Sequence, residues 1–279
     1  MRTERENGFL GDSLRIAVLV KQVPDSRDVR MDETTGTILR SPSDAVTNPL
    51  DLYALSAALR LKREVPETTI TAFSMGPESA KRSLREALAL GADDAILIQD
   101  RRFAGSDTLA TALILSATLE KFGPFDLVLT GERATDGETG QVGPEIAARL
   151  GIPPVTFVES LTRRPDRSFE AKRKTEVAME TIRFAPPALV AVTKGIGDPG
   201  LPTLNGKIAA RRRTIPTETA DNLPLPPNSI GLAGSPTRVV KIFHSVFTRH
   251  GEKFTISDEA SLSEGVAKMV AFLRKEGEA

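Results

Sequence analysis

No cysteine and no tryptophan occur among the 279 residues. Disulfide bonds, thiolate metal sites and cysteine nucleophiles are therefore excluded, and a cysteine-free chain suits the reducing cytoplasm, where we expect it to reside. Histidine is limited to His244 and His250, and tyrosine to Tyr53. A Ser-His-Asp hydrolase would have to recruit one of two histidines in a late, polar segment. We therefore expect no catalytic acid, base or nucleophile and no metal ligands here, so any redox chemistry must come from a bound cofactor.

The chain also lacks net charge and long apolar runs. Lysine plus arginine and aspartate plus glutamate both total 37. A nucleic-acid binder needs a cationic excess, so no nucleic-acid partner is expected. No apolar stretch approaches the roughly 18 residues of a membrane span, and the charged start does not resemble a signal peptide. Hydrophobic residues make up 40%, as in ordinary soluble globular proteins.

The first two-thirds of the chain alternates short apolar runs with helical patterns. Strands are predicted at 15–23, 69–74, 95–98, 126–130, 155–158 and 188–193. Helices are predicted to follow Asn48-Pro49, with Asn48 as the N-cap, and to span 78–90, 108–121 and 143–150. A small hairpin is expected within 30–47 and two further strands within 169–184. This alternation predicts an α/β fold with a doubly wound, mostly parallel sheet.

The last third has a different character. Residues 195–236 are rich in proline and glycine without periodicity, which is typical of an arm that lies over another protein. A terminal helix follows, because Leu262, Val266, Met269, Val270 and Leu273 share one helical face. We therefore divide the chain into an extension (1–14), an α/β domain (15–194) and a C-terminal arm with its helix (195–279).

The loop at residues 131–144 is the most informative stretch. It follows a predicted strand and precedes a helix, the edge at which open α/β sheets bind ligands. Gly137, Gly140 and Gly143 let backbone N–H groups approach an anion at the helix N-terminus, and Thr139 and Gln141 can donate hydrogen bonds. The alternative is a long capped loop without a ligand. No Gly-Lys-Ser/Thr follows, so this is not a Walker A loop.

Other candidate residues have two interpretations each. Met75 either contacts an adenine ring or packs in the core. Asp107 and Thr108 either line the pocket or only cap a helix. The cluster Arg211–Arg213 is either a solvated face or a docking patch for an acidic partner.

Seven segments, in order, resemble beta subunits of electron transfer flavoproteins across residues 15–215. They are VKQVPD (20–25), NPLDLYAL (48–55) with ALRLK (58–62), MGP (75–77), LREALALGAD (84–93), AGSDTLAT (104–111), DGETGQVGP (136–144) with LGIP (150–153), and PALVAV (187–192).

The resemblance implies an adenine nucleotide α-hydrolase-like domain and a C-terminal arm that wraps an alpha subunit. It assigns partner recognition to residues 199–207, with Leu204 as the anchor. It implies a nucleotide site at Leu19, Asn48, Asp51, Met75, Gly131, Arg133, Asp136, Glu138, Thr139, Gly140, Gln141 and Val142.

The implied protein is a heterodimer that passes electrons from acyl-CoA dehydrogenase-type enzymes or NADH to a quinone reductase or ferredoxin-type acceptor. FAD would be held mainly by the alpha subunit, and this chain would hold AMP. Residues 204–211 and 233–237 look more like the electron-bifurcating branch, in which a second FAD replaces AMP. The segment Arg173–Ala178 departs from the family, which usually has Arg-Glu and then paired glycines.

A stand-alone, adenine-nucleotide-binding regulator of the universal-stress type is the alternative. It would share the sheet and the pocket. It would not need the long arm or the terminal amphipathic helix.

Overall fold

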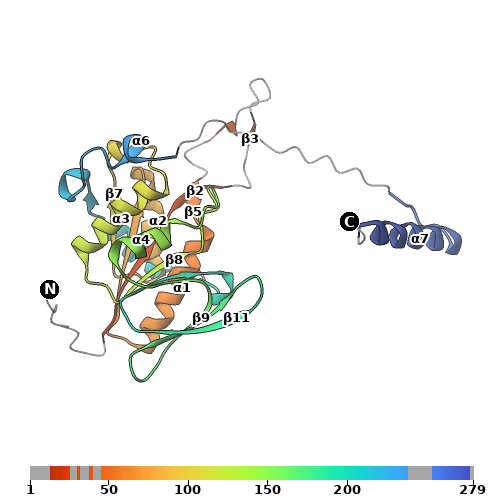
Figure 1. Cartoon of the computed structure of the whole chain (residues 1–279), viewed down its shortest axis with the longest axis horizontal. Helices are drawn as coiled ribbons and strands as arrows, with labels where there is room; N and C mark the ends of the chain where they lie inside the picture. The colour runs from red at the N-terminus through yellow and green to blue at the C-terminus, as the bar shows by residue number, and fades with distance from the viewer. Residues whose placement is uncertain (1–12, 26–29, 32–37, 40–44, 238–252, 277–279) are drawn as a thin grey trace. The chain divides into compact units, whose positions relative to one another are not determined.

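A computed structural model describes residues 13–25, 30–31, 38–39, 45–237 and 253–276. The described chain divides into two compact units, residues 1–238 and residues 239–279. The first unit is an α/β domain around one large sheet (Figure 1). Within the described residues, no helix is long and apolar enough to cross a membrane. His244 and His250 lie outside the described residues.

Nine strands form the large sheet, in the order β11-β10-β9-β12-β8-β1-β6-β7-β13. In chain order these are β1 (Arg15–Leu19), β6 (Thr69–Met75), β7 (Asp94–Ile98), β8 (Leu127–Gly131), β9 (Pro154–Arg163), β10 (Phe169–Lys174), β11 (Met179–Phe184), β12 (Ala188–Val192) and β13 (Thr217–Glu218). Neighbours from β9 to β13 in this order pair in parallel, whereas β10 and β11 pair antiparallel at one edge. The predicted doubly wound, mostly parallel fold is confirmed.

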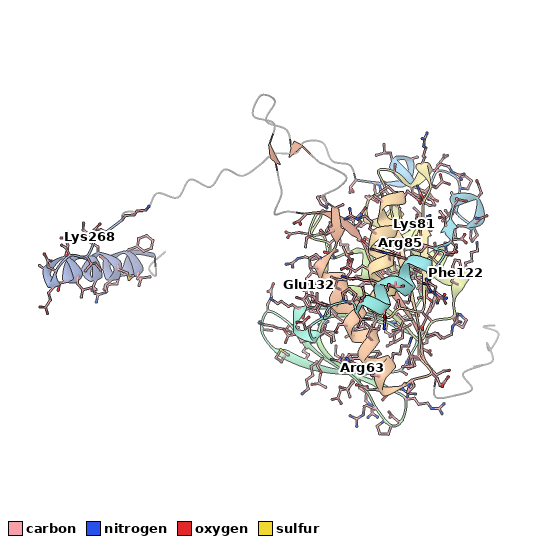
Figure 2. All side chains as sticks on the ribbon, turned by 180° about the vertical axis from the view of Figure 1, so that it is seen from behind. Arg63, Lys81, Arg85, Phe122, Glu132 and Lys268 are labelled. Carbon is pink, nitrogen blue, oxygen red and sulfur yellow. The ribbon has the colours of Figure 1, made fainter. Side chains whose placement is uncertain are left out.

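The helices lie on both faces of the sheet, because alternate strand residues point to opposite sides. Ile16 and Val18 of β1 pack into one core with α1 (Pro49–Glu64), α2 (Lys81–Leu90) and α5 (Leu204–Arg212). Ala17 and Leu19 pack into the other core with α3 (Thr108–Phe122) and α4 (Val142–Leu150). Figures 1 and 2, which view the molecule from opposite sides, show these two helical layers.

Two small antiparallel pairs precede α1. The predicted strand over 15–23 is interrupted, since β1 ends at Leu19 and β2 (Gln22–Pro24) leaves the large sheet to pair with β5 (Ala45–Thr47). The expected hairpin within 30–47 is present as β3 (Arg30–Met31) paired with β4 (Ile38–Leu39).

The expectation of an irregular stretch over 195–236 is wrong in part. Helix α5 packs along α2, where the Arg85 guanidinium donates to the Ala210 carbonyl oxygen at 3.0 Å (Figure 2). Strand β13 extends the sheet beside β7, and α6 (Gly231–Gly234) follows it. These residues belong to the same compact unit as the sheet. The wrapping of a partner subunit by residues 195–279 stays a prediction.

The second unit contains α7 (Glu259–Glu276), the predicted terminal helix. Its apolar side chains are exposed, with exposed fractions between 41% for Val270 and 63% for Met269 and Phe272.

Candidate functional site

The strand order creates a topological switch point between β1 and β8. The chain leaving β1 continues to β6 on one side, whereas the chain leaving β8 continues through α4 to β9 on the other. The two connections diverge, so a crevice opens at the carboxyl ends of these strands, where open α/β sheets bind their ligands. A cavity of about 360 Å³ lies there, within the size range of small-molecule sites.

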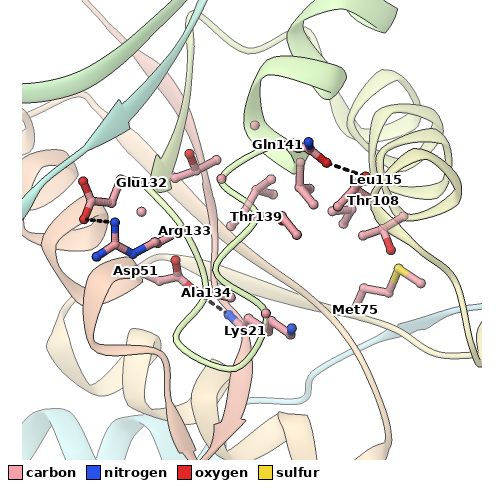
Figure 3. A pocket seen from close by; sticks show the side chains of 18 of the residues that line it. Lys21, Asp51, Met75, Thr108, Leu115, Glu132, Arg133, Ala134, Thr139 and Gln141 are labelled. Carbon is pink, nitrogen blue, oxygen red and sulfur yellow. Dashed lines mark hydrogen bonds and ion pairs between the residues drawn. The ribbon is translucent and has the colours of Figure 1, made fainter. Parts of the chain in front are cut away.

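Ten of the twelve residues that the resemblance assigns to a nucleotide site line this cavity (Figure 3). They are Leu19, Asp51, Met75, Gly131, Arg133, Glu138, Thr139, Gly140, Gln141 and Val142. Asn48 and Asp136 do not line it. Asn48 holds the loop that does, and Asp136 belongs to that loop. The structure thus brings these ten residues together from β1, α1, β6, β8 and α4 and from the loop between β8 and α4.

The loop between β8 and α4 forms one wall. Gly131 approaches α1 so closely that a Cβ atom there would lie 2.6 Å from Asp51 Oδ1. Gly140 has a φ of +62°, which favours glycine, and Glu138 has a φ of +52°. The loop ends at the N-terminus of α4, whose free N–H groups carry partial positive charge.

Asn48 has a role in the loop besides its predicted position at the start of α1. It occupies the N-cap position of α1, but its side chain makes no capping hydrogen bond. Instead its buried amide donates to the Arg133 carbonyl oxygen at 2.9 Å and accepts from the Thr135 N–H at 3.3 Å. Asn48 therefore fixes the glycine loop against the start of α1.

Asp51 is a buried carboxyl at the cavity wall, with 7% of its surface exposed. Its Oδ2 accepts from the Lys21 backbone N–H at 2.8 Å. Burial raises its pKa from 3.8 to about 7, although hydrogen bonds from the Lys21 N–H, the Asn48 side chain and the Gly131 N–H oppose this shift. The Asp51 carboxyl thus titrates near neutral pH inside the candidate site.

Helix α3 forms the opposite wall, which sequence reasoning identified only at its first turn. Thr108, Thr111 and Leu115 face the cavity at helical spacing. This spacing could have identified the cavity-facing side of α3 from the sequence. The helix is apolar on nearly all sides, however, so no single face stood out. Asp107 caps the helix as predicted, since its Oδ1 accepts from the Ala110 N–H at 3.1 Å.

Phe73 and Thr130 also line the cavity and were not predicted. Phe73 adds apolar surface beside Leu19 and Met75. The Thr130 hydroxyl is buried and has no hydrogen-bond partner among the residues that the structure describes. A buried hydroxyl normally finds a partner, so a ligand in the cavity can supply it.

The predicted partner anchor and the segment that departs from the family pattern lie away from the cavity. Leu204 is the first residue of α5 rather than part of an irregular arm, and its side chain is 73% exposed. Arg173, in the segment that departs from the family pattern, pairs across the β10–β11 hairpin with Glu180 at 2.7 Å. Among the described residues, no cluster of three or more histidine or acidic side chains is placed to hold a metal ion.

Comparison with known proteins gives consistent results. Residues 35–223 match the model of the electron transfer flavoprotein domain. The chain is 39% identical to an electron transfer flavoprotein subunit beta from Megasphaera elsdenii, covering 92% of this chain and 98% of the relative. It is 40% identical to the caffeyl-CoA reductase-Etf complex subunit CarD from Acetobacterium woodii, covering 87% and 92%. It is 36% identical to protein FixA from Azorhizobium caulinodans, covering 94% and 95%.

A domain match over more than half of the chain and identities near 40% over most of it agree with the segments and the fold described above. The chain therefore belongs to the electron transfer flavoprotein family, as a protein of the beta-subunit type, with a role in electron transfer.

Proposed function

We propose that this chain binds an adenine nucleotide, either AMP or a second FAD, in the cavity between β1, β8 and α3. The observation that carries the proposal is the placement of the glycine loop at the β1–β8 switch point, in front of the N-terminus of α4. Leu19, Phe73 and Met75 offer an apolar surface for a flat ring, while the loop offers N–H groups for phosphate.

The chain would act as one half of a cytoplasmic heterodimer. An alpha subunit would carry the FAD that accepts and donates electrons, and residues 195–279 would contribute to its binding. The names of the relatives support this arrangement, since they are described as a beta subunit and as a subunit of an Etf complex. The family match favours it over a stand-alone regulator.

The electron donors and acceptors follow from the same reasoning. The CarD relative is named as part of a complex with a reductase of a CoA thioester. We therefore propose flavoenzymes of the acyl-CoA dehydrogenase type as redox partners, with a quinone reductase or ferredoxin-type protein as acceptor. The resemblance of residues 204–211 and 233–237 to the electron-bifurcating branch favours two flavins per heterodimer and NADH-dependent bifurcation as a second candidate function.

Cofactor content tests the proposal. The full-length chain is co-expressed with the alpha-type subunit, and the purified complex is denatured and chromatographed. One FAD plus one AMP per heterodimer supports the proposal, and two FAD support its bifurcating form. One FAD without any second nucleotide contradicts it, because the cavity would then be empty in the native complex.

A further inference from the structure

Acidic side chains outnumber basic ones around the cavity. The ionisable residues that line it are Lys21, Asp51, Asp107, Glu132, Arg133 and Glu138. Backbone N–H groups at the glycine loop can bind a phosphate, but the carboxylates nearby repel it. A phosphate-bearing ligand would therefore gain most from a cationic side chain that can approach it.

Arg133 is poorly placed for that role. Its guanidinium lies 3.5 Å from the Glu132 carboxylate. Figure 3 shows both side chains turned to the side of the loop away from Thr139 and Met75.

Lys21 is placed differently. It follows β1, and its backbone N–H is fixed by the Asp51 carboxylate at 2.8 Å. Its side chain extends to the side of the glycine loop on which Met75 of β6 lies (Figure 3). The ammonium group binds both carboxylate oxygens of Asp136, at 2.7 and 2.8 Å.

The ion pair of Lys21 and Asp136 is one in which another anion can readily replace the Asp136 carboxylate. Its side chains are 48% and 31% exposed, so water screens the attraction and a partner can be replaced at little cost. Lys21 lines the cavity, whereas Asp136 belongs to the glycine loop without lining it.

We propose that Lys21 is the residue that pairs with the phosphate of the bound nucleotide, and that Asp136 holds its ammonium group until the ligand arrives. The inference rests on the proposed function, and it adds a ligand-contacting residue and a competing carboxylate. Both AMP and FAD carry the required phosphate.

If the Lys21–Asp136 ion pair is purely structural, removing the Asp136 charge changes nucleotide affinity in the opposite direction from the one that our proposal predicts. If the pair only ties the loop to β1, removing either partner weakens nucleotide binding. If Asp136 competes with the phosphate for Lys21, removing the Asp136 charge strengthens binding.

Titration calorimetry on the full-length chain in its complex, stripped of nucleotide, separates these cases. The probes are AMP, which is also the adenylate half of FAD, and adenosine, which lacks the phosphate. Lys21→Met is expected to lower AMP affinity about 10- to 100-fold, as for loss of a hydrogen bond between charged groups, with adenosine affinity unchanged. Asp136→Asn is expected to raise AMP affinity severalfold. Lys62→Met, which breaks a comparable ion pair with Asp93 outside the cavity, is the matched control and should change neither affinity.

Three results overturn the inference while leaving the proposed function intact. One is an unchanged AMP affinity in Lys21→Met, another is an equal loss of AMP and adenosine binding, and the third is weaker AMP binding in Asp136→Asn. A wild-type complex that binds neither AMP nor FAD overturns the proposed function, and this inference with it.

Discussion

At the scale of single residues, Gly140 has a backbone conformation that favours glycine and lies beside the proposed phosphate position. Its φ of +62° disfavours any side chain, and a Cβ atom would lie 3.3 Å from the Glu132 carbonyl oxygen. Replacing Gly140 with Asp adds a carboxylate beside the proposed phosphate as well. We expect Gly140→Asp to abolish nucleotide retention in the purified complex, measured after denaturation by chromatography.

The control for this substitution is Gly137→Ala in the same loop, because no atom of the described part of the chain lies within 4 Å of a Cβ atom at Gly137. It should retain the nucleotide. Gly140→Ala should be intermediate, since it introduces backbone strain of about 1–2 kcal/mol without charge. If Gly140→Asp retains a stoichiometric nucleotide, the loop is only a structural connection and the site assignment is wrong.

Asp51 makes stability depend on pH in a defined direction. Its pKa is about 7 in the folded chain, because burial disfavours the charged form, and the ordinary value is 3.8. Between these values the unfolded chain releases a proton that the folded chain keeps, so the free energy of unfolding falls as pH rises from about 4 to 7. The contribution of this one carboxyl is on the order of 4 kcal/mol.

Asp51→Asn removes that titration. In the ligand-free chain, we expect the stability difference between the variant and the wild type to shift in favour of the variant as pH increases from 4 to 7. Urea unfolding at several pH values measures it. A difference that stays constant across this range would show that Asp51 is already ionised in the folded chain at acidic pH.

At the scale of elements, helix α5 depends on a close contact with α2. A Cβ atom at Gly206 would lie 2.3 Å from the Ala89 carbonyl oxygen, so any side chain there must displace the helix. Intrinsic propensity favours alanine over glycine in a helix by about 1 kcal/mol, but overpacking costs about 1–3 kcal/mol. We expect Gly206→Ala to destabilise the domain in thermal or urea unfolding, against the propensity trend.

Gly265→Ala in α7 is the matched control, because none of the described residues has an atom within 4 Å of the added methyl group beyond the neighbouring turns of the helix itself. This variant should follow propensity and stabilise its helix. Equal gains in stability for both variants would contradict a tight α2–α5 contact. The contact also matters for the prediction about Leu204, since α5 presents that residue from a fixed position rather than from an irregular arm.

The elements that the sequence predicted best are those with strong local signals. Strands β1, β6, β7 and β8 and helices α1 to α4 were predicted from their apolar patterns. Asp107 at the start of α3 and Gly91 at the end of α2 marked helix boundaries. Helix α5 was missed because its sequence, LNGKIAARR, has no apolar stripe, and its position depends on long-range contacts with α2. Strand β13 has two residues and exists only because it pairs with β7, whose sequence lies far away in the chain.

At the candidate site, too, features that depend on long-range contacts could not be predicted from the sequence. The loop at residues 131–144 could be identified from its glycines and its position after a strand. The role of Asn48 could not, because its amide bonds peptide groups of residues 133 and 135, far along the chain. The contribution of Thr130 likewise depends on which strand lies next to β1, and strand order is not encoded in local patterns.

At the scale of the whole molecule, the α/β domain and helix α7 differ in how far they bury their apolar side chains. The domain has its own two cores, one on each face of the sheet. Helix α7 belongs to a separate unit and exposes Leu262, Val266, Met269, Val270, Phe272 and Leu273. Contiguous exposed apolar surface of this kind marks an interaction site or an aggregation liability.

We therefore expect the full-length chain, produced without its alpha-type subunit, to self-associate or aggregate in size-exclusion chromatography with light scattering. Val266→Asp with Met269→Lys places two charges on the apolar face and should restore a monodisperse monomer that still binds its nucleotide, because neither residue lines the cavity. Glu264→Gln with Lys268→Gln is the control, since it changes two charged residues of α7 that pair with each other at 3.3 Å and leaves the apolar face intact. A wild-type chain that is monodisperse and monomeric at micromolar concentration would contradict the need for a partner. Co-expression with the alpha-type subunit should make the wild-type chain soluble as a complex. The doubly charged variant should yield less of this complex, because the apolar face that makes the lone chain self-associate is the face that the partner would cover.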